Sequence, residues 1–151
     1  MVRTVNFVTD IILPFALNRK LIEGLAISEI PSFKAERVKW VLQHKNHKVE
    51  IGGEEWFTRN IDDLLSEQNI SLIPLIGIPG GFLGIQAWYL ILENFWRNLI
   101  KHNVQNISNI LNQNNQIVIH LEIIDKQNTP FWTVKLWAEV ETRKEACEEI
   151  K

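Results

Sequence analysis

The hydrophobic positions change their period along the chain, and each change marks a candidate element. Over residues 84–110 the apolar side chains recur at helical spacing, which predicts one long helix. Over residues 116–125 and 131–138 they occupy every second position, and the linker between the two runs contains Asn128 and Pro130. Period two in β-branched and aromatic residues, separated by turn residues, predicts an antiparallel hairpin.

Two helices are predicted in the N-terminal third of the chain. One covers residues 10–22, with Asp10 as its cap. The second is expected at residues 33–45, where Ser32 precedes apolar residues at helical spacing. Cationic or titratable side chains gather at its C-terminal end, where the helix dipole favours positive charge. They are His44, Lys45, His47 and Lys48.

Shorter elements fill the middle of the sequence. A turn is predicted at residues 52–53, and Asn60 opens a short helix that ends at about residue 67. The apolar run over residues 71–78 contains prolines and is expected to be an extended edge or a loop. The charged residues from Glu139 onward have a helical pattern.

One uncharged stretch, residues 69–92, is long enough to cross a bilayer. Prolines and glycines cluster in its middle, and they would leave backbone groups unpaired in lipid. We therefore expect a buried strand, loop and helix here, and no membrane partner.

A long helix followed by an antiparallel hairpin is typical of the α+β class, in which helices pack on one face of a sheet. The expected architecture is a two-layer sandwich with a small, mainly antiparallel sheet. Residues 1–70 are expected to form an N-terminal, mainly helical region. Residues 71–151 are expected to hold the long helix, the hairpin and a C-terminal helix.

Composition narrows the class of protein. The 151 residues are 46% hydrophobic, which is enough for a folded core. The formal net charge of −2 gives no basic excess, so no nucleic-acid partner is expected. The single cysteine, Cys147, cannot form an internal disulfide, and the first residues do not read as a secretory leader, so a cytoplasmic location is predicted.

Four polar side chains share one face of the predicted long helix. They stand at positions i, i+4, i+7 and i+8, which a helix brings together. The surrounding sequence is strongly apolar, and burying amide, ammonium and imidazole groups without hydrogen bonds would cost a few kcal/mol each. A phosphate–magnesium cluster is one partner that would suit all four groups. The residues are Asn94, Asn98, Lys101 and His102.

This stripe resembles the N box of the histidine-kinase-like ATPase superfamily, which includes gyrase, the mismatch-repair ATPases and a heat-shock chaperone. In its histidine-kinase form, that motif is an Asn, a second Asn four residues later, then Lys and an aromatic residue or His. The lead-in Pro79-Gly80-Gly81 and residues 87–94 are also similar to members of this superfamily. The resemblance covers roughly residues 72–138.

The resemblance implies ATP and magnesium as cofactors, with the N-box residues on the phosphate side. By resemblance, Asn98 would help to hold magnesium. Asn94 would lie near the metal and the attacking water, while Lys101 and His102 would face phosphate. The resemblance also implies a two-layer sandwich in which the N-box helix precedes antiparallel strands.

The sequence departs from the pattern of that superfamily on the adenine side. The relatives have an Asp followed by glycines where Ala138 stands here, and that Asp reads the adenine amino group. Glu139 is adjacent but would point to the other face of a strand. No Asp-x-Gly-x-Gly and no second glycine-rich phosphate loop follow, and Leu99 replaces the small residue that is usual after the second Asn.

Two functions of different classes remain open. The first is a truncated or degenerate ATP-binding domain that keeps the phosphate and magnesium side and lacks the adenine and lid motifs. It would be an ATPase only if other segments complete it, as part of a larger or split enzyme. The second is a non-enzymatic interaction or scaffold module derived from that fold, with a protein partner or a second copy in a homodimer.

Three further candidates have structural explanations of their own. Glu93 could act as a general base for water, but an ion pair with Arg97 at i+4 is the favoured interpretation. His120 lies in an alternating strand pattern and is expected to be a hydrogen-bonded sheet residue. His44 and His47 could contribute to a metal site, but no third ligand is evident in the sequence.

Overall fold

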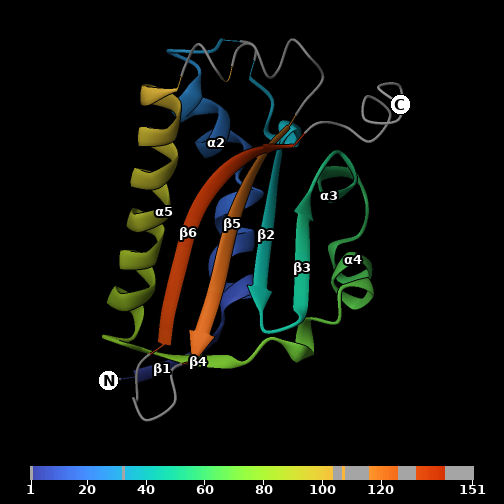
Figure 1. Cartoon of the computed structure of the whole chain (residues 1–151), viewed down its shortest axis with the longest axis vertical. Coiled ribbons are helices and arrows are strands. Elements are labelled where there is room, and N and C mark those ends of the chain that lie inside the picture. The colour runs from blue at the N-terminus through green and yellow to red at the C-terminus, as the bar shows by residue number, and fades with distance from the viewer. Residues whose placement is uncertain (1, 32, 104–106, 108–115, 126–131, 142–151) are drawn as a thin grey trace.

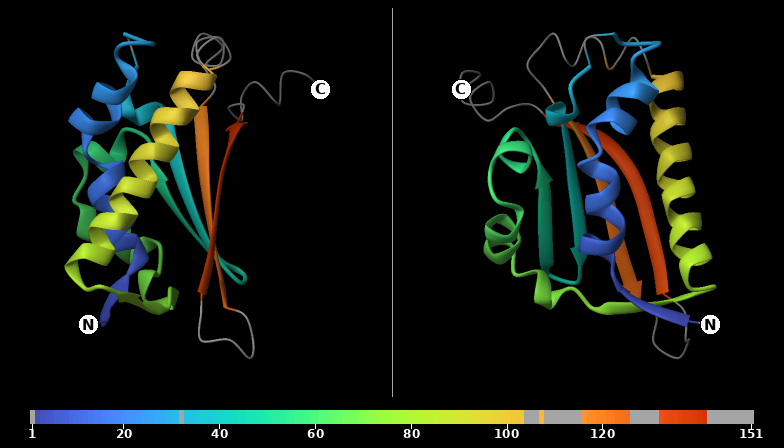
Figure 2. Two further views of the ribbon diagram at one scale, coloured as in Figure 1. Left: turned by 90° about the vertical axis from the view of Figure 1, so that its left-hand side faces the viewer. Right: turned by 180° about the vertical axis from the view of Figure 1, so that it is seen from behind.

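The computed structural model of the chain describes residues 2–31, 33–103, 107, 116–125 and 132–141. Helices pack against one face of a four-stranded sheet, and none of the described helices covers the opposite face (Figures 1 and 2). The predicted α+β sandwich is confirmed. In chain order the elements are β1 (Val2–Asn6), η1 (Phe7–Ile12), α1 (Leu13–Ala16), α2 (Arg19–Ala26), η2 (Ala35–Arg37), β2 (Val38–His44), β3 (His47–Gly52), α3 (Glu55–Thr58), α4 (Ile61–Glu67), η3 (Ile70–Leu72), β4 (Leu75–Pro79), α5 (Phe82–His102), β5 (Gln116–Asp125) and β6 (Trp132–Glu141).

The larger sheet has the strand order β3-β2-β5-β6. The pairs β2–β3 and β5–β6 are antiparallel, while β2 and β5 run parallel. The hairpin predicted in the C-terminal part of the chain is confirmed, with Gln116 opposite Glu141 at one end of the ladder. A second sheet joins β1 and β4, with Asn6 opposite Leu75, and it crosses one end of the larger sheet (Figure 1).

The core lies between the helices and the inner face of the larger sheet. Trp96 of α5 is fully buried there, and its indole Nε1 donates a hydrogen bond to the backbone carbonyl of Ile22 in α2 at 3.0 Å. The ring of Trp96 meets that of Phe33 edge-on. Because strand side chains alternate between faces, every second residue of the two central strands enters this core. These residues are Val38, Trp40 and Leu42 of β2 and Ile117, Ile119, Leu121 and Ile123 of β5.

The predicted helix over residues 10–22 is divided into three pieces. η1 is a π-helix whose cap is Asn6, because the Asn6 side chain accepts hydrogen bonds from two backbone N–H groups of the first turn. Asp10 is therefore not the helix cap. Its carboxylate instead accepts a hydrogen bond from the Asn6 N–H at 2.9 Å, which holds the cap residue in place. A second cap, Asn18, begins α2 and interrupts the helical path.

The helix predicted at residues 33–45 is wrong, because these residues form η2 and the strand β2. β2 is paired on both sides, in parallel with β5 and antiparallel with β3. A strand in the middle of a sheet gains ladder hydrogen bonds and buries apolar side chains, and this outweighs a weak helical period. The basic side chains expected at the helix end lie instead at the end of β2 and the start of β3, on both sides of a turn in which Lys45 has a φ of 55°. Ser32 lies outside the described residues.

Local predictions in the middle of the chain are confirmed. Asn60 caps α4 by accepting a hydrogen bond from the Asp62 N–H at 2.8 Å. The turn predicted at residues 52–53 closes β3, and the second half of the run 71–78 is extended as part of β4. Among the residues that the structure describes, no helix combines the length and apolar character that a membrane crossing requires.

The long predicted helix is α5, which begins two residues earlier than expected and ends at His102. Most of residues 104–110 lie outside the described part of the chain. β6 continues to Glu141, so residues 139–141 of the predicted C-terminal helix form a strand, and residues 142–151 lie outside the described part of the chain. Both sheets are built across the predicted boundary near residue 70, because β1 pairs with β4 and β2 pairs with β5.

The first turn of α5 packs closely on the end of β4, and this contact requires a glycine at position 84. A Cβ atom on Gly84 would lie 2.1 Å from the Pro79 carbonyl oxygen and 2.6 Å from the Ile78 Cγ2 methyl. Gly24, inside α2, would meet no atom within 4 Å. We expect Gly84→Ala to lower the free energy of unfolding by about 1–3 kcal/mol, because the backbone must shift.

The matched variant Gly24→Ala should raise the free energy of unfolding by about 0.5–1 kcal/mol, since it only restricts the unfolded chain. Urea denaturation followed by tryptophan fluorescence measures both variants. Effects of the same sign would contradict the packing of α5 on β4.

Candidate functional site

The polar stripe found in the sequence lies on one face of α5, and that face points away from the core. The buried side of the helix is defined by Ile85, Leu92, Trp96 and Ile100. At 3.6 residues per turn the stripe falls on the opposite side. Its four side chains are exposed and have no hydrogen-bond or ion-pair partner among the described residues; they are Asn94, Asn98, Lys101 and His102.

This exposure removes the energetic argument for a bound ligand. Amide and ammonium groups in water already have hydrogen-bond partners, so no penalty remains for a phosphate to relieve. The expectation of an apolar setting for the stripe is wrong, because the apolar neighbours in sequence lie on other sides of the helix. Lys101 and His102 also occupy the last turn of α5, where they complement the helix dipole.

Within the stripe, Asn94 and Lys101 are seven residues apart, which is about 10 Å along a helix. Gly80 and Gly81, in contrast, precede the helix and lie about 20 Å from Asn94 by the same rise per residue. These glycines have φ values of 85° and 57°, so they serve the turn into α5 and do not reach the same phosphate group as Lys101.

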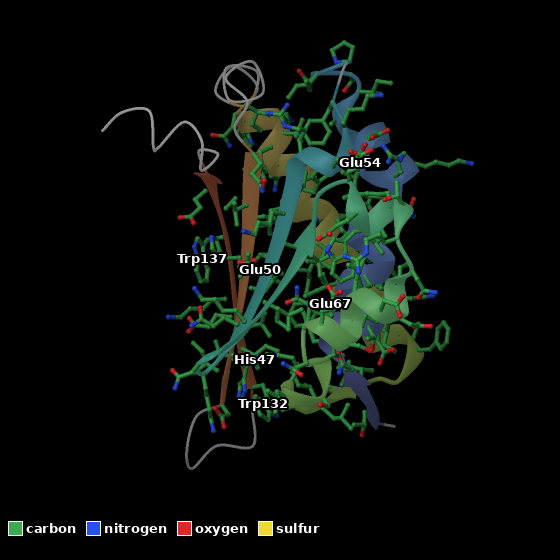
Figure 3. The ribbon with its side chains drawn as sticks, turned by 90° about the vertical axis from the view of Figure 1, so that its right-hand side faces the viewer. His47, Glu50, Glu54, Glu67, Trp132 and Trp137 are labelled. Carbon is green, nitrogen blue, oxygen red and sulfur yellow. The ribbon has the colours of Figure 1, made fainter. Side chains whose placement is uncertain are left out.

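On the adenine side, the structure places Ala138 and Glu139 on opposite faces of β6, as predicted. Ala138 is opposite Ile119 and faces the core, where it is half-buried. The Glu139 carboxylate lies 2.6 Å from Nε2 of His120 on the face without helices. His120 also stacks on Trp137, with the two rings 5.0 Å apart, and Figure 3 shows Trp137 on that same face. His120 is thus the hydrogen-bonded sheet residue expected from the sequence.

Glu93 forms the predicted ion pair. Its carboxylate accepts a hydrogen bond from the Arg97 guanidinium at 2.7 Å, one turn further along α5. The pair binds the Glu93 carboxylate to its own helix. Glu93 lies at the side of the helix and not within the polar stripe, so the structure separates it from Asn94 and Asn98.

A groove that the sequence did not predict runs between α5 and the N-terminal helices. It consists of two neighbouring hollows of about 370 and 200 Å³ that share Pro14 and Tyr89. The Tyr89 hydroxyl donates a hydrogen bond to the backbone carbonyl of Asp10 at 2.7 Å and so bridges the two sides of the groove. No local signal in the sequence marks this contact, because the two residues are 79 positions apart.

The candidate metal residues His44 and His47 are opposite one another at the end of the β2–β3 hairpin. His44 Nε2 lies 3.8 Å from an Asp125 carboxylate oxygen, while His47 Nε2 lies 3.0 Å from the backbone carbonyl of Gln68. The two rings therefore have different partners. Within the described ranges no group of three or more metal-binding side chains occurs.

Comparisons with known proteins give no family for this chain. No protein-family model, no curated protein and no solved structure matches it. The similarity of the α5 stripe to an N box therefore stays a prediction.

Tyr89 offers a direct test of the groove. Burial raises the pKa of its phenol, and the nearby Asp10 carboxylate raises it further. Folding thus favours the neutral phenol, so this contribution to stability is complete below the ordinary tyrosine pKa of about 10 and is lost as the pH rises through the raised value. Tyr89 is the only tyrosine, so the ultraviolet absorption of tyrosinate reports it alone.

We expect the absorption of the folded protein to titrate at a higher pH than that of the urea-unfolded chain. The variant Tyr89→Phe should lose less stability above about pH 10 than the wild type. A midpoint at or below the unfolded value would show that the phenol is not held in the groove.

Proposed function

We propose that the outward face of α5 is the phosphate and magnesium side of an ATP-binding site of the histidine-kinase-like type. Asn98 would ligate magnesium, Asn94 would lie near the metal and its water, and Lys101 and His102 would neutralise phosphate. The observation that supports this most is that the four matching side chains share one accessible face of one helix.

Affinity for nucleotide should be weak in this chain by itself. Half-buried Ala138 offers no hydrogen bond to an adenine amino group, and the chain has no second glycine-rich phosphate loop. Exposed charges also act in a high dielectric, where one ion pair contributes little. Binding would then rest on magnesium and phosphate contacts, so nucleotides with different bases should bind alike.

Hydrolysis is not proposed for the chain alone. Glu93, which precedes the stripe in sequence, is paired with Arg97. Water attack on a phosphate needs a positioned water and charge stabilisation on both sides of the phosphate, and a single helix face supplies only one of these sides. The proposed site therefore comprises only the phosphate and magnesium side of a nucleotide site. ATPase activity requires further segments that supply the other side.

A second candidate function, a protein-interaction module, is favoured by a different observation. The N-terminal half of α5 exposes large apolar side chains where most helices of this kind are polar. They are Phe82, Leu83, Leu90 and Ile91, which are 46–75% exposed. Exposed large apolar side chains gathered on one helix mark contacts with other proteins more often than they mark chemistry.

The nucleotide proposal predicts heat on titration of the chain with magnesium and a non-hydrolysable ATP analogue at millimolar concentration. Asn98→Ala and Lys101→Ala should each weaken binding at least tenfold, which is about 1.4 kcal/mol, because each removes one phosphate-side contact. Lys20→Ala, at an exposed cation on α2, is the matched control and should bind as the wild type does. Isothermal calorimetry measures all four proteins.

If Lys20→Ala lost as much affinity for the analogue as the two α5 variants, the binding would be general charge attraction and not recognition by the stripe. Absence of heat in the wild type at millimolar analogue would reject the nucleotide function and leave the interaction module.

A further inference from the structure

The two edge strands of the larger sheet differ in whether other residues bond to their outer side. At the β3 edge, Gln68 covers the strand: the Glu50 N–H donates to the Gln68 side-chain oxygen at 3.2 Å, and His47 Nε2 lies 3.0 Å from the Gln68 carbonyl oxygen. β6 forms the other edge, and no described strand pairs with its outer side. Alternate backbone groups along its ten residues therefore face outward, which is the usual template for an added strand.

Side chains on the inner face of β6 are only half covered. Those of the neighbouring strand β5 on the same face, Ile117, Ile119, Leu121 and Ile123, are at most 2% exposed. The inner residues of β6 pack against the core yet remain partly exposed, and they are Trp132, Val134, Leu136 and Ala138. The core therefore excludes solvent from the inner face of β5, but solvent reaches the inner face of β6.

α5 turns an apolar flank toward the same opening. Its other flank is fixed by Gln86 and Glu93, which line the groove against Pro14. The flank on the far side of the buried stripe must then face the β6 side. That flank holds Ile91, Phe95 and Leu99, whereas the Trp88 ring meets that of Phe7 in η1 edge-on. Phe95 and Leu99 are half-buried against the core, and Ile91 is 46% exposed.

These two rows of half-covered apolar residues border one slot. Figure 1 shows α5 running beside β6, and the left panel of Figure 2 shows α5 on the helical side of the sheet. An added strand would lie about 4.8 Å beyond β6, with α5 over its inner face. We propose that this slot binds one extended strand of a partner polypeptide that directs apolar side chains toward α5 at alternate positions.

A single bare strand fits this slot better than a second copy of the chain does. Edge-to-edge pairing of two copies about a two-fold axis would place the α5 of each copy in the helical layer of the other. A helix is about 10 Å across, whereas the next strand position is about 4.8 Å away, so the two layers would collide. Residues 142–151 are a poor source, because their apolar positions 146, 147 and 150 do not alternate.

The opposite face of β6 gives the partner strand a charge pattern. Lys135 and Glu139 are both exposed there, with Trp137 between them. Opposite charges directly across a pair of strands stabilise it, and like charges oppose it. An antiparallel partner should therefore carry a cation opposite Glu139 and an anion opposite Lys135. This inference does not depend on nucleotide binding.

The probe is the peptide Thr-Val-Lys-Val-Thr-Val-Glu-Val-Thr, titrated into the full chain. Hydrogen exchange of the β6 amides, followed by NMR, measures binding residue by residue. We expect the β6 amides that point away from β5 to become protected. Peptides in which threonine replaces every valine, or in which Lys and Glu are exchanged, should protect them at least tenfold less at the same concentration.

Two isoleucine-to-lysine variants locate the slot. Ile91→Lys, on the flank of α5 toward β6, should weaken the peptide at least tenfold. Ile61→Lys, at an exposed isoleucine of α4 beside the opposite, β3 edge of the sheet (Figure 1), is the matched control and should bind normally. Both sites are exposed, so both variants should fold, which circular dichroism checks.

Absence of β6 protection at millimolar peptide would overturn the proposal, and so would equal weakening by the two lysine variants. Protection of the β6 amides without any peptide, together with a dimer in sedimentation, would assign the edge to a second copy instead.

Discussion

The parallel pairing of β2 with β5 is the interaction on which the rest of the structure depends. It joins Val38–His44 to Gln116–Asp125 and so turns two separate hairpins into one sheet. Parallel neighbours need a crossover connection, and here that connection contains α5. The sheet in turn offers one continuous apolar face, on which α5 and α2 pack and are linked by the Trp96 hydrogen bond to the Ile22 carbonyl. Without this pairing each hairpin would expose the inner half of its side chains, since an isolated two-stranded ribbon is marginal in water.

The predictable part of the fold is the part with local causes. Asn60 predicts the start of α4 because its side chain caps the helix by accepting a hydrogen bond from an N–H only two residues away. The β5–β6 hairpin and α5 have sequence periods that are long enough to be unambiguous. β2 has no such signal: its apolar run is short, and what makes it a strand is a partner far along the chain. The sequence predicts a single helix where η1 and α2 are separate. Their caps, Asn6 and Asn18, both lie within one apolar pattern that does not show the interruption.

The candidate site shows a different limit of sequence reasoning. Spacing identified correctly that Asn94, Asn98, Lys101 and His102 share a helix face, because 3.6 residues per turn is a fixed property. Spacing alone cannot say whether that face meets protein or water when the flanking residues are apolar on every side. The answer depends on which flank the sheet covers, and β2 and β5 decide that together. The groove around Tyr89 was missed because its two walls meet only after α5 packs on η1.

Nucleotide binding at the polar stripe and strand binding at the β6 edge are compatible because they use different sides of α5. The buried side is committed to the core, one flank forms the groove with η1 and α1, and the other flank borders the open edge of β6. The polar stripe lies between these flanks, with Asn98 and His102 turned toward the β6 side. A strand docked on β6 would bring low-dielectric material close to these two residues, and electrostatic attraction to phosphate strengthens as water is excluded. Under the two proposals taken together, occupation of the edge would raise the affinity of the stripe for nucleotide, and by linkage nucleotide would favour the docked strand by the same factor.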